Sequence, residues 1–478
     1  MVYFFACVAL LIVGYFVYGR IVDRIFGPDP HRPTPAITLA DGVDYVEMSP
    51  KKIFLVQLLN IAGLGPIFGP ILGALYGPSA LLWIVFGCIF GGAVHDYFSG
   101  MLSVRHGGRS IPDVVGKELG NGFKQFMRLF SIVLLLLVGV VFVLGPAKLL
   151  GNLTGLAVPA WVTIIFVYYF LATILPIDKI IGRIYPFFGA VLIFMAVGLT
   201  AALILQGYHF PALTLANLHP KALPLWPLMF ITIACGAVSG FHATQSPLMA
   251  RCIGNEKYGR PLFFGAMIGE GVIALIWATL GMAFYNGSPG LGDALAKGGP
   301  AFVVNDISTS LLGPIGGLLA IIGVVILPIS SGDTAFRSAR LIIADFIKLP
   351  QKAVSKRLLL AVPLFVIGFL VSRGEFGVIW RYFGWANQTL ATIVLWAAAA
   401  YLAREAKLHW IASLPGTFMT AVAVTYICYD KIGFGLSLQT SSILGVTAAA
   451  ASLFLFLIRF RKGALEAEAE AIAAAEGA

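Results

Sequence analysis

Apolar runs long enough to cross a bilayer recur from one end of this chain to the other. A membrane-spanning helix needs roughly 20 consecutive apolar residues, and hydropathy predicts thirteen such runs in the 478 residues. The composition agrees, because 59% of the residues are apolar and 11% are charged, whereas soluble proteins carry about a quarter charged residues. We therefore predict an all-α integral membrane protein with spans at roughly 2–22, 53–76, 79–103, 126–150, 158–176, 184–206, 225–243, 262–286, 312–332, 357–372, 379–402, 408–428 and 437–459.

The distribution of lysine and arginine predicts the orientation of these spans. With the N-terminus outside, all but six of the 32 basic residues fall in cytoplasmic loops or helix ends, as the positive-inside rule requires. The predicted location is the inner (plasma) membrane, with the C-terminus in the cytoplasm. The net charge of +10 thus reflects topology, and no nucleic-acid module is visible. The six basic residues left outside are Lys148, Lys221, Lys297, Arg373, Arg381 and Lys431.

Two features of the chain are predicted to be structural. The N-terminal run MVYFFACVALLIVGYFVYGR has no basic n-region and no small-residue cleavage site, so we expect a retained helix and not a signal peptide. The five cysteines are scattered without CxxC spacing, and most lie in apolar segments. They are expected to be buried thiols, with neither a disulfide framework nor a metal site.

Two of the apolar spans contain residues that interrupt a helix. The stretch NIAGLGPIFGP, Asn60 to Pro70, holds three glycines and two prolines, and CGAVSGFHATQSP, Cys235 to Pro247, is similarly irregular. Inside a bilayer, irregular backbone is tolerated only where it is buried in protein or lines a cavity. Glycines can instead serve tight helix packing, but that alternative explains Pro66 and Pro70 poorly. The breaks are therefore interpreted as functional.

The two broken spans occupy corresponding positions, as core helices 1 and 6 of two five-helix halves that run in opposite directions. This arrangement is typical of secondary transporters, which bind substrate at the interface of the two repeats. The predicted units are an N-terminal helix with a cytoplasmic loop, two repeats, two C-terminal helices and an Ala/Glu-rich cytoplasmic tail, at residues 1–52, 53–206, 207–402, 403–462 and 463–478.

Ionisable residues inside predicted spans are few, and each is a functional candidate because burying it in the membrane is costly. Glu270 lies in core helix 7, and His95, Asp96, His242 and Asp333 fall in the cytoplasmic half of the membrane or at its edge. These last four can form one cluster, which suits a proton or ion relay, a cytoplasmic gate, a metal site or mutual structural satisfaction. Adjacent helical residues point about 100° apart, which disfavours a metal site built from both His95 and Asp96.

Oxygen atoms and free N–H groups are expected near the breaks. Ser330 and Ser331, with carbonyls freed around Ala62–Gly65, can form an oxygen cage for Na⁺, although the two hydroxyls can also bond back to their own helix. The half-helices beginning near Gly65–Pro66 and Gly240 present unpaired N–H groups at the positive end of the helix dipole. That environment favours an anionic substrate group, such as a carboxylate.

Several of these segments carry a resemblance to a known family. NIAGLGPIFGPILGALYG, GGAVHDYFSGMLSVRHGGRSI, SGFHATQSP, LPISSGDTAFRSARL and GWANQ resemble, in order across roughly residues 40–400, the carbon starvation protein A (CstA) family. The resemblance implies an inner-membrane transporter of the amino acid–polyamine–organocation type that imports peptides or pyruvate. The GWANQ segment differs from the G-[IL]-[SA]-N-Q form expected in the family, which puts the bulky Trp385 beside the expected site.

Together these observations predict a LeuT-like 5+5 inverted-repeat core in an H⁺- or Na⁺-coupled importer of small peptides or pyruvate. We expect no enzymatic activity, no cofactor beyond the coupling ion, no metal, no nucleic acid, and only substrate and membrane lipids as partners. The sequence leaves the substrate, the coupling ion and the oligomeric state open. The expected substrate-binding residues are Asn60, Gly63, Gly65, Pro66, Ser239, Gly240, His242, Asn387 and Gln388, and the expected coupling residues are Ala62, Ser330, Ser331, Asp333, His95 and Asp96.

Two alternatives belong to other functional classes. An ion channel needs a continuous polar or carbonyl-lined path through the membrane, whereas the polar residues here gather towards one side. An intramembrane metal-dependent enzyme needs a catalytic motif such as HExxH or GxSxG, and the chain has neither. Both remain open as alternatives to the transporter.

Overall fold

A computed structural model describes residues 2–42, 44–174, 177–210, 212–351 and 353–476, with the side chains of 174–186 and 461–476 left undescribed. The described residues form helices and one isolated bridge, Met48 to Ile253. The helices are α1 (Val2–Phe16), α2 (Tyr18–Phe26), α3 (Pro35–Thr38), α4 (Pro50–Ile61), α5 (Gly65–Gly73), η1 (Ala74–Tyr76), α6 (Ser79–Phe86), η2 (Gly87–Gly92), α7 (Ala93–Arg105), α8 (Ile111–Leu119), α9 (Asn121–Thr154), α10 (Val158–Ile174), α11 (Ile177–Leu205), α12 (Leu225–Thr232), α13 (Gly240–Ala250), η3 (Glu256–Tyr258), η4 (Arg260–Phe264), α14 (Gly265–Phe284), α15 (Ser288–Ile347), α16 (Val354–Val371), α17 (Phe376–Arg404), α18 (Trp410–Tyr429) and α19 (Leu438–Glu476).

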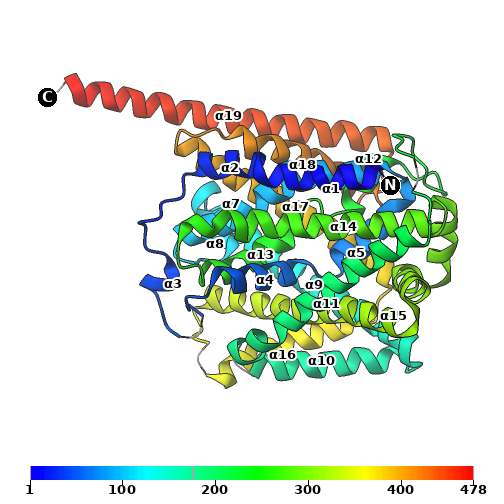
Figure 1. The fold of residues 1–478 in the computed structure, drawn as a ribbon. Coiled ribbons are helices and arrows are strands. Elements are labelled where there is room, and N and C mark those ends of the chain that lie inside the picture. Colours follow the sequence, from blue (N-terminus) through cyan, green and yellow to red (C-terminus); the bar gives the residue numbers. More distant parts are fainter. Residues whose placement is uncertain (1, 43, 175–176, 211, 352, 477–478) are drawn as a thin grey trace.

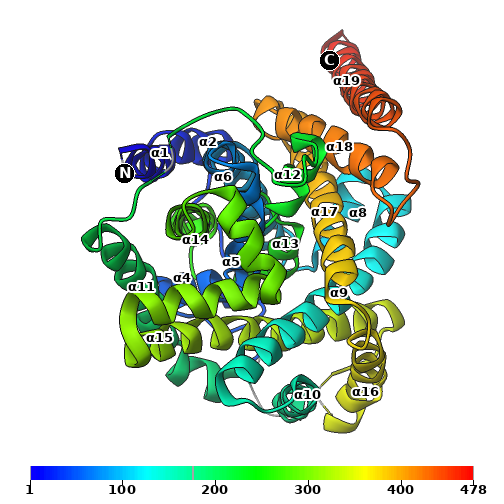
Figure 2. The same cartoon turned by 90° about the vertical axis from the view of Figure 1, so that its right-hand side faces the viewer.

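The long helices run side by side as a bundle, with α13, α14 and α17 near its centre and α10, α16 and α19 at its edge (Figures 1 and 2). The burial of the spans follows this arrangement, since 83% of the apolar window is buried in the span that contains α14 and 22% in α16 and in α19. Peripheral helices with exposed apolar side chains are expected where a bundle faces lipid. The fold therefore places the polar residues of α13 and α14 in its most enclosed part.

The predicted spans correspond to helices of the structure. Among the described residues, ten helices are long and apolar enough to cross a membrane, or eleven when the bent pair α4–α5 counts as one span. Two more predicted spans fall on the shorter apolar helix α10 and on the interrupted pair α12–α13, so the total of thirteen stays a prediction. The predicted span 312–332 lies inside α15, a run of 60 residues that is kinked at Gly298, Gly299 and Gly313.

Some of the predicted features fall outside the described residues. The end of the predicted span 158–176 is one such part, and the side chains of the tail 463–478 are another. Five of the basic residues that indicate the orientation also have no described side chain, namely Lys179, Arg183, Lys352, Arg461 and Lys462. The described chain starts in α1 at one end of the bundle and leaves it through α19 at the other end, as expected for an odd number of crossings (Figure 1).

An ionic network closes one end of the bundle, on the left in Figure 1. We call this end of the bundle the basic end. At the end of α7, Arg105 donates from Nε and Nη2 to the buried carboxylate of Glu256, at 3.3 and 3.2 Å, and from Nη2 to the Gly27 carbonyl at 2.7 Å. The Asp29 N–H donates to the same carboxylate at 2.8 Å, and Arg105 also bonds the Tyr401 hydroxyl. Paired hydrogen bonds from one arginine fix orientation as well as charge, so this network joins the N-terminal segment to α7, η3 and α17.

Candidate functional site

The first predicted break is present in the structure. The helix α4 ends at Ile61, α5 begins at Gly65, and the span bends by 47° between them. Ala62 has a non-helical conformation (φ −78°, ψ 53°), and Pro66 occupies the first turn of α5, where a missing N–H costs nothing. A Cβ added to Gly65 would overlap the side chain of Cys235 in the other broken span. Glycine at this position therefore lets the two breaks touch.

The second predicted break lies between the end of α12 at Thr232 and the start of α13 at Gly240. Gly236 lies in this segment with φ +90°, a conformation that favours glycine. Asn387 of α17 holds the segment, because its Oδ1 accepts the Phe241 N–H at 2.6 Å and its Nδ2 donates to Ser239 Oγ at 3.2 Å. Two of the expected substrate-binding residues, Ser239 and Asn387, thus support the broken backbone itself.

The remaining expected binding residues also surround the breaks. Gln388 donates from Nε2 to the Phe230 carbonyl in α12 at 3.0 Å. A Cβ on Gly240 would overlap the backbone of Asn387, and one on Gly63 would meet the Phe142 ring. Asn60 is buried near the end of α4. These residues line or brace the breaks, and their contact with substrate stays a prediction.

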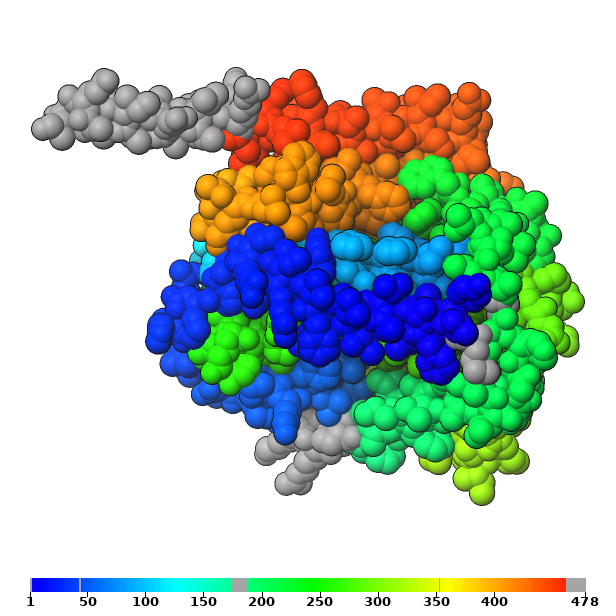
Figure 3. Space-filling view, turned by 45° about the horizontal axis from the view of Figure 1, so that its top comes forward, coloured from blue at the N-terminus to red at the C-terminus, as the bar shows by residue number. Residues whose placement is uncertain are grey.

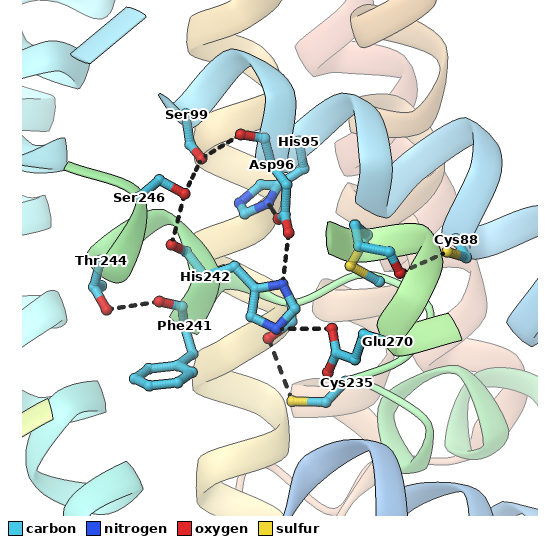
Figure 4. A network of polar contacts seen from close by, with 12 residues as sticks. Cys88, His95, Asp96, Ser99, Cys235, Phe241, His242, Thr244, Ser246 and Glu270 are labelled. Carbon is cyan, nitrogen blue, oxygen red and sulfur yellow. Dashed lines mark hydrogen bonds and ion pairs between the residues drawn. The ribbon is translucent and has the colours of Figure 1, made fainter. Parts of the chain in front are cut away.

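Four fully buried ionisable side chains form a continuous chain beside the second break (Figure 4). His95 Nδ1 lies 2.8 Å from Asp96 Oδ1, and Asp96 Oδ2 lies 2.8 Å from His242 Nδ1. His242 Nε2 lies 3.2 Å from Glu270 Oε2. The members come from three helices, α7, α13 and α14. We call His95, Asp96, His242 and Glu270 the ionisable chain.

The ionisable chain agrees in part with the sequence analysis. His95, Asp96 and His242 come together as expected, but Glu270 takes the fourth position, and the expected divergence of neighbouring side chains does not separate His95 from Asp96. One carboxylate can contact two imidazoles because its two oxygens face different ways. Glu270 was a candidate on its own, as a carboxylate inside an apolar span, but one sequence does not reveal which neighbour its helix face meets.

Asp333 lies in a different environment. It pairs with Arg337 one turn along α15, with Asp333 Oδ2 3.3 Å from Arg337 Nη2. It also lies close enough to Tyr168 and Tyr169 of α10 to interact with them electrostatically. No contact with the ionisable chain is found for it among the described residues. The sequence grouped Asp333 with the histidines by its depth in the membrane, and depth does not determine the direction in which a side chain points.

The two serines of α15 also separate. Ser331 Oγ donates across to the Leu59 carbonyl of α4 at 3.1 Å, whereas Ser330 Oγ donates to Leu327 in its own helix at 2.8 Å. Only Ser331 therefore lies where the expected oxygen cage requires a hydroxyl, next to a carbonyl just before the break at Ala62. Ser330 bonds back to its own helix, as in the alternative interpretation. We call Ser330, Ser331 and Asp333 of α15 the hydroxyl flank of the core.

Trp385 does not face the breaks as expected. Its Nε1–H donates to the Ala423 carbonyl of α18 at 3.2 Å, and its ring packs edge-on against Phe130 at 5.9 Å. The residues Trp385 and Asn387 are two positions apart on α17, so their side chains point to nearly opposite sides of the helix. The tryptophan therefore packs towards α18 while Asn387 reaches the second break.

Two members of the ionisable chain, together with Cys235, form a group that could hold a metal ion. The ligand atoms of Cys235, His242 and Glu270 lie within 4.8 Å of one another, and the second ring nitrogen of His242 is held by Asp96. Sulfur, nitrogen and carboxylate ligands of this kind suit zinc. The same atoms also make the His242–Glu270 ion pair, and the expectation that no metal binds stays a prediction.

Comparison with known proteins identifies the family. A family model described as carbon starvation protein CstA matches residues 1–154, 146–288 and 286–426. An uncharacterized membrane protein of Haemophilus influenzae is 52% identical over 354 residues, 62% of this chain and 95% of that protein. The peptide transporter CstA of Bacillus subtilis is 27% identical, covering 90% of this chain and 89% of its own. The pyruvate/proton symporter BtsT of Escherichia coli is 28% identical over 340 residues, 57% of this chain and 47% of its own.

The fold is also shared with a solved transporter. Mhp1, a nucleobase-cation-symport-1 family transporter in a closed conformation, superimposes with a TM-score of 0.54 at 15% identity, covering 89% of this chain and 97% of its own. The LeuT-like fold expected from the breaks is confirmed by this likeness, and the named relatives are transporters and not enzymes. The protein is a multi-pass membrane protein, and the chain belongs to the carbon starvation protein CstA family.

Proposed function

We propose that the protein is a proton-coupled secondary transporter that imports a small carboxylate, pyruvate or a short peptide, by alternating access. The observation that carries this proposal is the ionisable chain, which is fully buried and ends beside the broken backbone between α12 and α13. Intramembrane groups of this kind are costly and are used for proton relays in transporters. A proton on this chain would therefore change the charge next to the substrate site.

The geometry of His242 favours protons as the coupling ion. Both of its ring nitrogens face carboxylates, Asp96 at 2.8 Å and Glu270 at 3.2 Å. A doubly protonated ring suits this position, because only the imidazolium form has two N–H donors. The contact with Glu270 is an ion pair without good hydrogen-bond geometry. This misaligned link is the one at which we expect the proton to be gained and lost.

A carboxylate substrate is supported by the helix ends at the breaks. Leu64 does not cap α5 with its side chain, and Ser239 does not cap α13, although the Phe241 N–H in the first turn of α13 already donates to Asn387 Oδ1. The first N–H groups of a helix and its dipole attract anions. The relatives named for peptide and pyruvate transport supply two substrates that both carry a carboxylate. The two halves 53–206 and 207–402 would rock about this site, with the basic end on the cytoplasmic side of the inner membrane.

Uptake into proteoliposomes tests the proposal. Purified protein is reconstituted, and labelled pyruvate and a labelled dipeptide are offered in parallel under an inward proton gradient, an inward Na⁺ gradient and no gradient. The proposal predicts accumulation of one compound above its equilibrium level with the proton gradient and no increase with Na⁺. Accumulation driven by Na⁺ alone would reject proton coupling. Uptake that only equilibrates under every gradient would reject secondary active transport of these compounds.

A metal measurement separates the relay from the metal alternative. Metal content is determined on the same purified protein by inductively coupled plasma mass spectrometry. A relay built from His242 and Glu270 predicts less than one metal ion per chain and uptake that resists chelators. One tightly held zinc ion per chain, lost together with uptake in a Glu270→Gln variant, would contradict the proton-relay role of these residues.

A further inference from the structure

A groove of about 470 Å³ lies at the periphery of the bundle, between α19 and the pair α17–α18. Figure 3 shows α19 lying along this outer face of the molecule. The walls of the groove are mainly apolar and include Ile393 and Trp396 of α17 and Leu455 and Phe456 of α19. Leu455 is 65% exposed, so the groove opens sideways, where the bundle faces lipid. Its volume lies within the range of small-molecule sites, and its walls suit an acyl chain.

Two charged residues line the groove at the basic end, Glu118 of α8 and Arg459 of α19. The Glu118 carboxylate is already occupied, since it pairs with Arg404 and accepts a hydrogen bond from His106 Nε2 at 2.8 Å. Burial, together with neighbouring lysine and arginine side chains, lowers the pKa of His106 to about 4. The ring is therefore neutral near pH 7 and donates to Glu118 without adding charge.

Arg459 is the second charged residue that lines the groove. It is exposed, and it makes no ion pair or hydrogen bond with any described side chain. It lies close enough to Arg404 for the two positive charges to repel. Arg404 has two acidic neighbours, its partner Glu118 and the nearby Glu405, so Arg459 is the lining residue that brings unpaired positive charge to the mouth of the groove. Arg459 also lies at the end of the apolar part of α19, Leu438–Phe460, which is the depth at which phospholipid headgroups begin.

We propose that this groove binds one anionic phospholipid, with an acyl chain along the apolar walls and the phosphate group at Arg459 and Arg404. An apolar channel that ends in a basic cluster matches the two parts of such a lipid, and basic pockets between helices on the cytoplasmic side bind anionic headgroups. Free phosphate would use only the mouth. The lining residues of the groove lie outside the breaks and the ionisable chain, so lipid binding can be measured separately from transport.

The site has a direct route to the core. Thr392 lines the groove and donates from Oγ1 to the Gln388 carbonyl at 2.8 Å, one turn away on α17. Gln388 in turn bonds the last turn of α12 through its side chain. A lipid packed against α17 would thus contact the same helix that braces the second break.

Native mass spectrometry of the full-length protein tests this proposal. The protein is delipidated in a non-ionic detergent and mixed with phosphatidylglycerol or phosphatidylcholine of identical acyl chains. We expect one retained phosphatidylglycerol, bound more tightly than phosphatidylcholine. In Arg459→Gln the retention of phosphatidylglycerol should fall about fivefold, as expected for one basic residue near a headgroup. The matched control is Arg373→Gln, which removes an exposed arginine at the opposite end of the bundle.

A second variant and a competitor identify the ligand. Ser452→Phe, on the wall contributed by α19, should reduce retention of both lipids because it fills the groove. Millimolar inorganic phosphate should leave the bound phosphatidylglycerol in place. Equal retention of the two lipids, wild-type behaviour of Arg459→Gln, or displacement by phosphate alone would each overturn the proposal. A dimer that Ser452→Phe dissociates would also overturn it, by assigning the groove to contact between copies of the chain.

Discussion

The ionisable chain and the hydroxyl flank lie on different sides of the broken helices and differ in chemistry. On one side, α7, α13 and α14 contribute two carboxylates and two imidazoles that contact one another in series. On the other side, α15 meets α4 through a neutral hydrogen bond, from Ser331 Oγ to the Leu59 carbonyl. The hydroxyl and carbonyl of this contact are uncharged groups that can coordinate a cation, whereas the carboxylates and imidazoles of the ionisable chain can gain and lose protons. Proton coupling and Na⁺ binding would therefore have separate locations in this protein.

The largest expected effect belongs to Asp96→Asn, which removes the carboxylate shared by the two histidines. Breaking a buried charge pair from one side costs about 3–5 kcal/mol, so the charged form of His242 should become inaccessible. We expect proton-driven accumulation to fall at least about a hundredfold, while exchange of labelled for unlabelled substrate persists. The measurement is uptake under a proton gradient beside counterflow without one.

The matched control for this variant is Asp333→Asn, the same substitution in a buried carboxylate of the hydroxyl flank. Both proteins should elute as folded particles in size-exclusion chromatography. Normal gradient-driven accumulation by Asp96→Asn would remove the ionisable chain from the mechanism, and with it the functional difference between the two regions.

Glu270→Gln should have the second largest effect. The substitution keeps the shape of the side chain but leaves His242 with one carboxylate, Asp96, so the ring no longer needs two N–H donors. We expect the pH dependence of counterflow to flatten between about pH 5 and 8, with maximal exchange within about tenfold of the wild type. A pH profile that matches the wild type would show that Glu270 does not exchange the proton.

Ser331→Ala should have a smaller effect. It removes one hydrogen bond between α15 and α4, worth about 1 kcal/mol, so we expect up to about a fivefold loss of uptake and a lower melting temperature. Ser330→Ala is the control, because the Ser330 hydroxyl donates to the Leu327 carbonyl of its own helix, and it should change neither quantity. If Ser331→Ala also abolished a stimulation by Na⁺ that the wild type shows, the hydroxyl flank would be an ion site, and proton coupling alone would be insufficient.

The smallest expected change in coupling belongs to Asp333→Asn. This carboxylate pairs with Arg337 on its own helix, so its neutralisation should lower thermal stability but leave the proton-driven accumulation ratio within about twofold of the wild type. Accumulation ratios at several external pH values check this expectation. A loss of coupling as large as that of Asp96→Asn would restore the role that the sequence alone suggested for Asp333.

Both breaks were predictable from the sequence because they depend on local chemistry. Gly65 and Pro66 interrupt one span, and Gly236 and Gly240 interrupt the other, and a bilayer tolerates such interruptions only where protein or a cavity surrounds the backbone. The proximity of His95, Asp96 and His242 was also predictable, since charges buried in a membrane need partners. The resemblance of five segments to the carbon starvation protein family supplied the family, which the comparisons confirm.

The partners of Glu270, Asp333 and Trp385 were not predictable, because they depend on the rotation of each helix about its own axis. Membrane depth follows from the position of a residue along its helix, but the direction of its side chain follows from packing between helices. Glu270 faces α13, Asp333 faces along α15 towards Arg337, and Trp385 faces α18. Glu270 is the only ionisable residue of α14, so no polar stripe in the sequence marks the face that this helix turns towards α13.

The network at the basic end has a consequence for the order in which the protein is made. Asp29 and Glu256 are 227 residues apart in the chain, and Arg105 and Tyr401 are 296 apart. Synthesis proceeds from the N-terminus, so the first segments of the protein enter the membrane before their partners in the network, Glu256 and Tyr401, have been made. Completion of this network is therefore a late event in biogenesis. A ribosome that stops before it reaches Tyr401 leaves a protein that already holds Arg105, but whose basic end lacks its final partner.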